Sequence, residues 1–259
     1  MTEAGERFYQ RALDILEQVD ATQREISEGQ SEVKGKLVVY SPTLLLDKCR
    51  HHVSQFVREH PDCELELHST ALGQRAVLDR RFDLLIYIGE PFDSSFIARP
   101  LANVGYDYFA SPDYLERCGM PEIPEDLFKH RCIYRSRNEQ DPVAWQFGDE
   151  ELAINPDIIC DSPYMTNAFL LQGIGVGQLP LILAASSVAK GQLVRLFAGQ
   201  YAFRQNIYGL YSSRRYLPHK VKVLIDDIKN DLPGEIEALE SLLENPPDTG
   251  EMSPTATLS

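Results

Sequence analysis

The sequence predicts an α/β fold in which helices cover a largely parallel sheet. Two observations carry this prediction. Short apolar runs at residues 36–40, 63–67 and 82–88 alternate with amphipathic segments, and this β-α-β-α-β alternation is typical of parallel sheets. The alternation returns with different spacing from residue 106 onward, which indicates a second α/β unit. A chain of 259 residues is long enough to give both units a core.

Small hydroxyl residues follow the strands of the first unit. Ser41, Pro42 and Thr43 come directly after the first strand, where a serine N-cap and a proline in the first turn are the expected start of a helix. Ser69 and Thr70 follow the second strand in the same way and predict a helix that reaches about residue 80.

The second unit has the same organisation. Its predicted strands are at residues 106–110, 132–134, 145–147, 158–160, 175–179 and 206–211. Its predicted helices begin at Pro112, at residue 124, at Pro163 after the Ser162 cap, at residue 181 and at residue 217, the last of them ending at residue 232. The tail, residues 233–259, contains a few helix formers and then a polar, proline-rich stretch, which predicts a largely disordered segment.

Charge and composition exclude several functions for these residues. The formal net charge is −14, so the surface repels phosphate backbones and does not by itself favour nucleic-acid binding. The N-terminus lacks the apolar core of a secretory signal, and no apolar run reaches the length of a membrane span. The five cysteines are scattered, with no metal-site spacing. We therefore expect a cytoplasmic protein with free thiols, no metal, no cofactor and no membrane contact.

The first 31 residues predict a long helix with an apolar seam. Apolar side chains recur at Phe8, Ala12, Ile15, Val19 and Ile26, with Thr22 in the one gap, and these alternating steps of four and three residues are the heptad pattern of a helix that pairs with another helix. The alternative is a helix that lies on its own domain. The sequence favours a dimerisation or connector helix.

Three predicted strand ends lead into helix N-termini that carry hydroxyl groups, at Ser41, Ser69 and Ser162. Free backbone N–H groups and the positive end of the helix dipole favour an anion such as a carboxylate at such a place. The alternative is that each hydroxyl only caps its own helix. Three such starts in two successive units favour one shared cleft, because ligands bind outside the carboxyl ends of parallel strands.

Several motifs carry a resemblance to a known family. In chain order they read GKLVV (35–39), FDLLIYIG (82–89), DSSFIAR (93–99), ASPDYL (110–115) and GIGVGQLP (173–180), with PEDL, HRC and WQF between the last two. Together with the TEAG entry to the first helix, their order and spacing resemble the linker helix and effector-binding domain of LysR-type transcriptional regulators. The resemblance covers residues 1 to about 232.

The resemblance implies a two-lobed, periplasmic-binding-protein-like (type 2) fold. Lobe I would combine residues 36–100 with 208–232, and lobe II would take residues 105–205. The crossovers between them would lie near residues 100–105 and 205–208. The family also carries a winged helix-turn-helix ahead of the linker helix, which is not in this sequence, so promoter DNA would be bound only through that other domain.

The resemblance also implies a small-molecule effector in the cleft between the lobes, and a homodimer or homotetramer whose geometry the effector changes. The cleft positions that it implies are Ser41, Pro42, Thr43, Ser69, Thr70, Ile88, Gly89, Tyr134, Arg135, Ser162 and Pro163. Arg135 is the candidate partner of an anionic effector, because a guanidinium can grip a carboxylate with two hydrogen bonds. The alternative for Arg135 is a solvated residue at a strand end.

Two other classes of protein compete with this interpretation. An enzyme is disfavoured because no nucleophile elbow, zinc-protease or phosphate-loop motif occurs, and the glycines at residues 173–177 lead into a strand instead of a helix. A solute-binding protein of the same two-lobed fold is the alternative function. Such a protein is expected to have an export signal and no heptad helix in front, whereas this sequence has the opposite of both.

Overall fold

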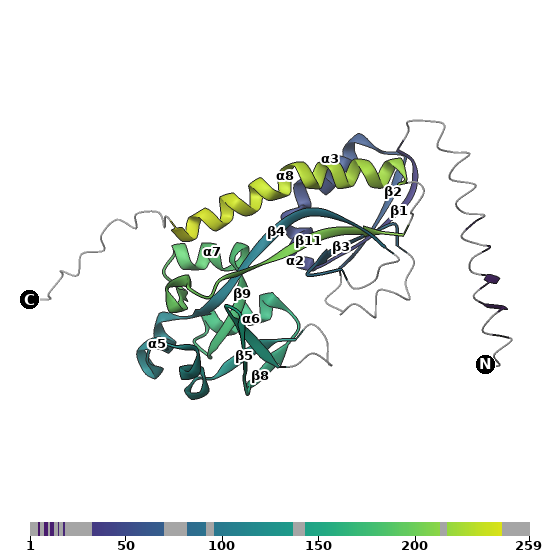
Figure 1. The fold of residues 1–259 in the computed structure, drawn as a ribbon. Helices are drawn as coiled ribbons and strands as arrows, with labels where there is room; N and C mark the ends of the chain where they lie inside the picture. The colour runs from purple at the N-terminus through teal and green to yellow at the C-terminus, as the bar shows by residue number, and fades with distance from the viewer. Residues whose placement is uncertain are drawn as a thin grey trace, which may run out of the picture.

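The computed structural model describes residues 33–69, 82–91, 96–136, 143–212 and 217–244, together with residues 5, 8, 9, 11, 12, 15 and 18. The elements form one long mixed sheet with helices packed on it and a separate two-stranded hairpin (Figure 1).

The described strands are β1 (Gly35–Ser41), β2 (Cys63–Ser69), β3 (Leu84–Ile88), β4 (Ile97–Ala110), β5 (Cys132–Arg135), β6 (Ala144–Phe147), β7 (Glu150–Ala153), β8 (Ile158–Cys160), β9 (Val176–Pro180), β10 (Val194–Arg195) and β11 (Phe203–Tyr211). The described helices are α2 (Thr43–Lys48), α3 (Arg50–Glu59), α5 (Pro112–Cys118), α6 (Pro163–Leu171), α7 (Leu181–Ala189) and α8 (His219–Glu244), with the 3-10 helices η1 (Pro124–Lys129) and η2 (Leu196–Gly199).

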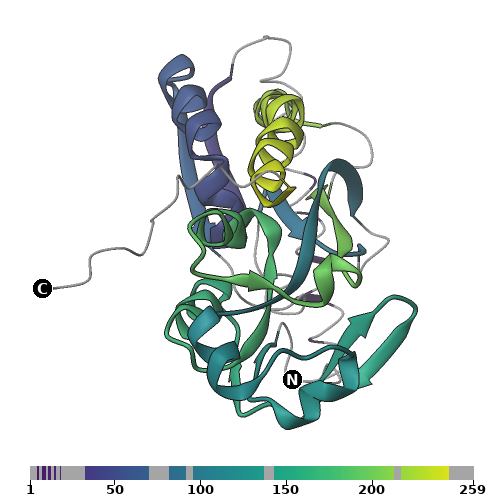
Figure 2. The same cartoon turned by 90° about the vertical axis from the view of Figure 1, so that its left-hand side faces the viewer.

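The strand order divides the sheet into two ends. It runs β2-β1-β3-β11-β4-β9-β5-β8. We call β2, β1 and β3, with α2 and α3, the β1 end. We call β9, β5 and β8, with α5, α6 and α7, the β5 end. The long strands β4 and β11 join the two ends, and the sheet curls between them (Figures 1 and 2).

Parallel pairing is confirmed within each end. β1 pairs with β2 in parallel from Gly35–Cys63 to Ser41–Ser69, and it pairs with β3 in parallel as well. At the other end, β5 is parallel to both β8 and β9. The joining strands are antiparallel to their neighbours, so the two parallel sets run in opposite directions.

The two joining strands are longer than the sequence predicts. β4 begins at Ile97, although the pattern predicted a strand only from residue 106, and β11 begins at Phe203 instead of 206. The expected crossovers near 100–105 and 205–208 therefore lie inside continuous strands. Pro100 is tolerated because it pairs with Tyr208 where the register shifts, and a proline lacks the N–H that a regular ladder needs.

Apolar residues from both faces form the cores. The largest core joins the β1 end to α8, with fully buried side chains such as Leu37, Phe56 and Ile225. At the β5 end one core lies under α6 and α7, and a second, aromatic core on Tyr108 and Trp145 includes side chains of β6. The turn after β6 returns as β7, a strand that the sequence pattern did not predict.

The helix starts of the β1 end differ from the prediction. Ser41 is the last residue of β1, and the residue that precedes α2 is Pro42, without a side-chain cap. The segment after Pro42 folds as two helices, because the chain turns at Cys49. Ser69 is the last residue of β2, since the parallel ladder with β1 continues to it. Thr70 and the helix predicted after it lie outside the described residues.

Helix α8 continues past the boundary that the sequence predicted at residue 233. It runs through Pro233 to Glu244. Pro233 is exposed, and the buried Leu232 and Ile236 on either side of it pack into the large core. This packing outweighs the hydrogen bond that a proline removes from a helix interior. Residues 245–259 lie outside the described part of the chain.

Only part of the predicted N-terminal helix is described. Phe8, Ala12 and Ile15 have helical backbone, and the side chains of Phe8 and Ile15 are 75% and 60% exposed. Val19 and Ile26 lie outside the described residues. Among the helices that are described, none has the length and hydrophobicity to cross a membrane.

Candidate functional site

Strand register brings the carboxyl ends of both parallel sets to one level of the sheet. The last residue of β3, Ile88, pairs with Ile207 of β11, which in turn pairs with Ala102 of β4. The last residue of β9, Pro180, pairs with Tyr106 of β4. The two sets therefore approach residues 102–106 of β4 from opposite directions. Ligands of α/β proteins bind at such strand ends.

The β1 end contributes a pair of exposed hydroxyl groups. Thr43 and Ser69 are both exposed, and their hydroxyl oxygens form a short hydrogen bond. Ser41 pairs with Ser69 in the ladder, but its side chain is fully buried and donates weakly to the carbonyl of Pro42 at 3.3 Å. Of these predicted positions, Thr43 and Ser69 can therefore reach a ligand directly, whereas Ser41 is covered.

Gly89 turns the chain where β3 ends. Its φ of +116° is a backbone conformation that side chains with a Cβ rarely adopt, which accounts for a glycine at this position. The Gly89 N–H donates to the carbonyl of Asn206 at 2.9 Å, so the turn is tied to β11. Ile88 and Gly89 are partly exposed beside this joining strand.

At the β5 end, the side chain of Arg135 lies over the joining strand β4. The guanidinium carbon of Arg135 lies 5.6 Å from the centroid of the Tyr106 ring, a cation–π distance. The ring of Tyr106 is almost fully buried and stacks on Phe203 at 5.4 Å. Arg135 pairs with Cys160 of β8, and Tyr134 beside it packs against the aromatic core. Arg135 is therefore held over β4, and the alternative of a solvated arginine does not describe this geometry.

The start of α6 joins the two ends. The Ser162 hydroxyl accepts a hydrogen bond from the N–H of Met165 at 3.4 Å, and Pro163 is the first helical residue, so Ser162 caps its own helix. The next residue, Tyr164, packs against the large core of the β1 end. Burial raises the pKa of Tyr164, and the nearby Asp47 carboxylate raises it further. The helix is thus in contact with both ends.

The sequence did not identify Tyr106 or Tyr164 as site residues. Tyr106 was visible only as an apolar position of a strand, and Tyr164 only as a residue of the first helical turn. Alternation along the strand could have placed the Tyr106 ring on one face of the sheet. No local pattern could have paired it with Arg135, because that contact depends on the antiparallel pairing of β4 with β9.

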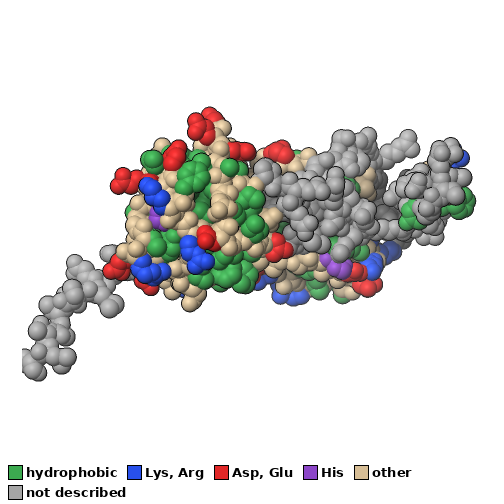
Figure 3. Space-filling view, turned by 90° about the horizontal axis from the view of Figure 1, so that it is seen from below, with side chains coloured by type: hydrophobic (Ala, Val, Ile, Leu, Met, Phe, Trp, Pro, Cys, Tyr) green, Lys and Arg blue, Asp and Glu red, His purple; other side chains and the backbone are tan. Residues whose placement is uncertain are grey.

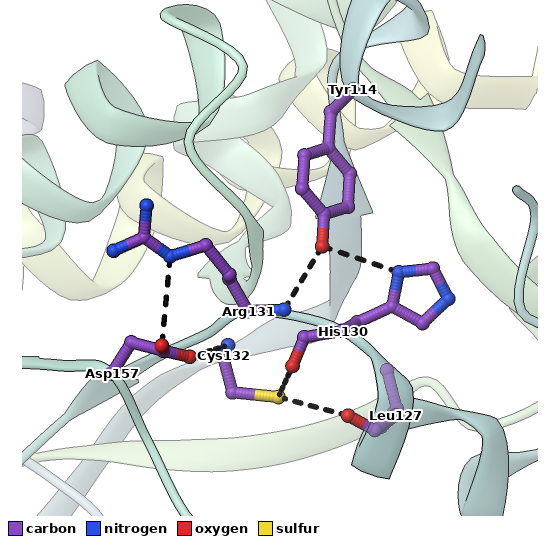
Figure 4. A network of polar contacts seen from close by, with 6 residues as sticks. All are labelled: Tyr114, Leu127, His130, Arg131, Cys132 and Asp157. Atoms are coloured by element: carbon purple, nitrogen blue, oxygen red, sulfur yellow. Dashed lines mark hydrogen bonds and ion pairs between the residues drawn. The ribbon is translucent and has the colours of Figure 1, made fainter. Parts of the chain in front are cut away.

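A network of hydrogen bonds fixes the base of β5 (Figure 4). The Tyr114 hydroxyl accepts from the Arg131 N–H at 2.9 Å and lies 3.2 Å from Nδ1 of His130. The Cys132 N–H donates to the Asp157 carboxylate at 3.2 Å. Burial raises the pKa of Tyr114 to about 12 and that of Cys132 to about 11. Both groups are therefore protonated at neutral pH, as befits a structural network that orients β5.

The described surface shows neither an obvious metal site nor a uniform charge. In the described ranges no three His, Cys, Asp or Glu side chains are grouped to hold a metal ion. Seen from below, the β5 end exposes apolar side chains between charged ones (Figure 3). The exposed large apolar side chains that follow α5 in the chain are Met120, Ile123 and Phe128.

Two opposed sets of parallel strands, joined by two long antiparallel strands with the strand ends facing each other, define a periplasmic-binding-protein-like α/β domain. Residues 30–233 match the family model of the LysR substrate binding domain. The chain therefore belongs to the LysR family of transcriptional regulators.

Relatives with known names support this assignment. The chain is 29% identical over 250 residues to the HTH-type transcriptional regulator PtxR of Pseudomonas aeruginosa, covering 91% of this chain and 76% of PtxR. It is 26% identical over 238 residues to the HTH-type transcriptional regulator CrgA of Neisseria meningitidis, covering 90% of this chain and 79% of CrgA. These relatives regulate transcription, which decides against a solute-binding protein.

Solved structures agree with the fold. The structure of CrgA, a LysR-type regulator from Neisseria meningitidis, matches at a TM-score of 0.66 with 25% identity, covering 92% of this chain and 80% of that one. The full-length structure of the Vibrio cholerae virulence activator AphB matches at a TM-score of 0.65 with 24% identity, covering 88% and 79%.

Proposed function

We propose that this chain is the effector-sensing and oligomerisation region of a cytoplasmic LysR-type regulator, and that it binds a small anion between its β1 and β5 ends. The observation that carries the proposal is Arg135, held over the Tyr106 ring where the strand ends of both sets meet. The hydroxyls of Thr43 and Ser69 supply hydrogen-bonding groups from the other end. A guanidinium with nearby hydroxyls suits a carboxylate.

The proposed mechanism is a shift between two arrangements of the ends. In this proposal the β1 end, together with α8 up to residue 232, belongs to lobe I (36–100 and 208–232), and the β5 end belongs to lobe II (105–205). A ligand that touches both lobes stabilises the arrangement in which both contacts are made. The chain would transmit that change to a second copy, and promoter DNA would be bound through a winged helix-turn-helix domain. No catalytic step is part of this proposal.

The ligand site can be tested by thermal shift with a panel of small carboxylates. We expect at least one to raise the melting temperature of the wild type, because a ligand bound to the native state stabilises it. In Arg135→Gln that carboxylate should bind about 10- to 100-fold more weakly, since a hydrogen bond to a charged group contributes about 1.5–3 kcal/mol. Arg58→Gln, an exposed change on α3, is the matched control and should bind normally.

A second substitution tests the β1 end. Thr43→Trp places a bulky side chain beside Ser69 at an exposed position, so it should remove the response without unfolding the domain. Normal binding by both Arg135→Gln and Thr43→Trp would show that the site lies elsewhere.

The oligomerisation role rests on the exposed apolar seam of the first helix. Sedimentation of the wild type should give a dimer or tetramer, and Phe8→Asp with Ile15→Asp should reduce its mass, because charges cannot be buried in a helix pair. A wild-type monomer would contradict this part of the proposal.

A further inference from the structure

The last turns of α8 form a brace that the matched domain does not include. The family match ends at residue 233, whereas α8 continues to Glu244. This extension lies above α7 and beside β4, at the place where the joining strands pass from one end to the other (Figures 1 and 2).

Glu240 connects the extension to both joining strands. Its Oε1 accepts a hydrogen bond from the backbone N–H of Gly105 in β4 at 2.9 Å. Its Oε2 accepts from Nη1 of Arg204 in β11 at 2.8 Å. Gly105 and Arg204 face each other in the β4–β11 ladder. One carboxylate, only 12% exposed, thus holds a facing pair of residues on the two strands.

The position of Gly105 explains why an external acceptor is needed. On its other side β4 pairs with β9, but that ladder ends at Pro180, which pairs with Tyr106. Leu181 already belongs to α7, and a Cβ on Gly105 would lie 2.5 Å from its side chain. Gly105 therefore lies just past the end of the ladder, where the carboxylate of Glu240 accepts its N–H.

Apolar contacts fix the extension to both ends of the molecule. Ile236 is buried in the core of the β1 end, and Leu239 packs against the same core. Leu243 packs against the core under α6 and α7 at the β5 end. The helix therefore bridges the two ends, and Glu240 lies between these anchors.

We propose that Glu240 is a positioning residue that fixes the angle between the β1 and β5 ends by clamping β4 to β11 at Gly105 and Arg204. The clamp does not depend on the effector site and would operate even if no small molecule bound between the ends.

The first test measures the contact itself. Amide hydrogen exchange at Gly105, followed by NMR, should become about tenfold faster in Glu240→Ala, the size expected for one charge-assisted hydrogen bond. Glu240→Gln keeps an acceptor for the Gly105 N–H but loses the ion pair with Arg204, so exchange should change less. Glu237→Ala, an exposed change one turn earlier on α8, is the matched control and should leave Gly105 unchanged.

The second test measures the angle between the ends. Nitroxide labels on the exposed Cys118 and on a cysteine introduced by Glu64→Cys report the distance between α5 and β2, in a Cys160→Ser background diluted with unlabelled protein. The parent and Glu237→Ala should give one narrow distance distribution. Glu240→Ala and Arg204→Ala should both broaden or shift it.

The two measurements separate positioning from simple stability. A purely structural role would lower the melting temperature of Glu240→Ala and leave the distance distribution of the folded protein as narrow as in the parent, and this result would overturn the proposal. Unchanged exchange at Gly105 in Glu240→Ala would overturn it as well. The milder Glu240→Gln keeps the test usable if the alanine variant does not fold.

Discussion

The cores of the two ends of the molecule are built from different kinds of side chain. The β1 end is held mainly by one large and largely aliphatic core shared with α8, and a smaller cluster around Tyr40, Leu85 and Leu210 covers the other face of its strands. The β5 end likewise has cores on both faces of the sheet, but one of them is a large aromatic core with Trp145, and next to it the fully buried Asp107 of β4 pairs with the partly exposed Arg195. Apolar packing tolerates small shifts, whereas buried polar pairs demand fixed geometry. We therefore expect the β5 end, which carries Arg135, to be the more precisely oriented of the two.

The largest effect is expected in the aliphatic core. Phe56→Ala removes a fully buried ring from α3 and should lower the free energy of unfolding by about 3–5 kcal/mol. Val57→Ala, at a neighbouring position that is 46% exposed, should change it by less than about 0.5 kcal/mol. Urea denaturation compares the two. Equal effects would show that the core does not hold the β1 end.

The ion pair of the β5 end gives the next effect. Burial raises the pKa of Asp107, and Arg195 opposes that shift. Arg195→Leu would leave the fully buried Asp107 carboxylate without its cation. We expect the free energy of unfolding to fall by about 3 kcal/mol, and not by more, because Arg195 itself is partly exposed. The double variant Asp107→Leu with Arg195→Leu should recover part of that loss. A double variant less stable than Arg195→Leu would contradict this account.

Replacing the serine at a strand end should cost more stability at the β5 end than at the β1 end. Ser162 caps α6 at the β5 end, and Ser162→Ala should cost about 1 kcal/mol. Ser41 caps no helix, so Ser41→Ala should cost less than about 0.5 kcal/mol. Thermal unfolding of the two variants checks the order, and the reverse order would show that the helix starts are wrongly assigned.

The smallest effect concerns pH at the β5 end. Burial lowers the pKa of His130 below its usual 6.5, so the unfolded chain binds a proton more readily than the native one. The contribution of His130 to stability is therefore fully present above pH 6.5, and it is lost as the pH falls toward the pKa of His130 in the native state. His130→Gln should therefore flatten the loss of stability between pH 7.5 and 5.5, measured with urea. His51→Gln, an exposed control, should keep the wild-type slope.

Sequence reasoning succeeded where local chemistry decides the structure. The three parallel strands of the β1 end and the capped helices at Ser111 and Ser162 follow from apolar runs and from Ser-Pro starts, and the structure confirms them. It failed where the structure depends on which distant segments pair or pack together. The full lengths of β4 and β11, the hairpin strand β7 and the continuation of α8 through Pro233 all depend on contacts with distant segments.

The candidate site divides in the same way. The hydroxyl residues after the first two strands could be read from the pattern, whereas Arg135 was implied by the resemblance to LysR-type regulators. The sequence could not show that Ser41 is buried, or that Tyr106 lies under Arg135, because both depend on the register between strands. The assignment of these residues to an effector remains a prediction.

Hydrogen exchange with the carboxylate that gives the largest thermal shift tests the central claim most directly. The claim is that one ligand contacts the strand ends of both parallel sets. We predict slower amide exchange in two separate segments, residues 43–46 at the start of α2 and residues 134–136 at the end of β5. Protection confined to one of these segments, or found in neither while the ligand is bound, would contradict it.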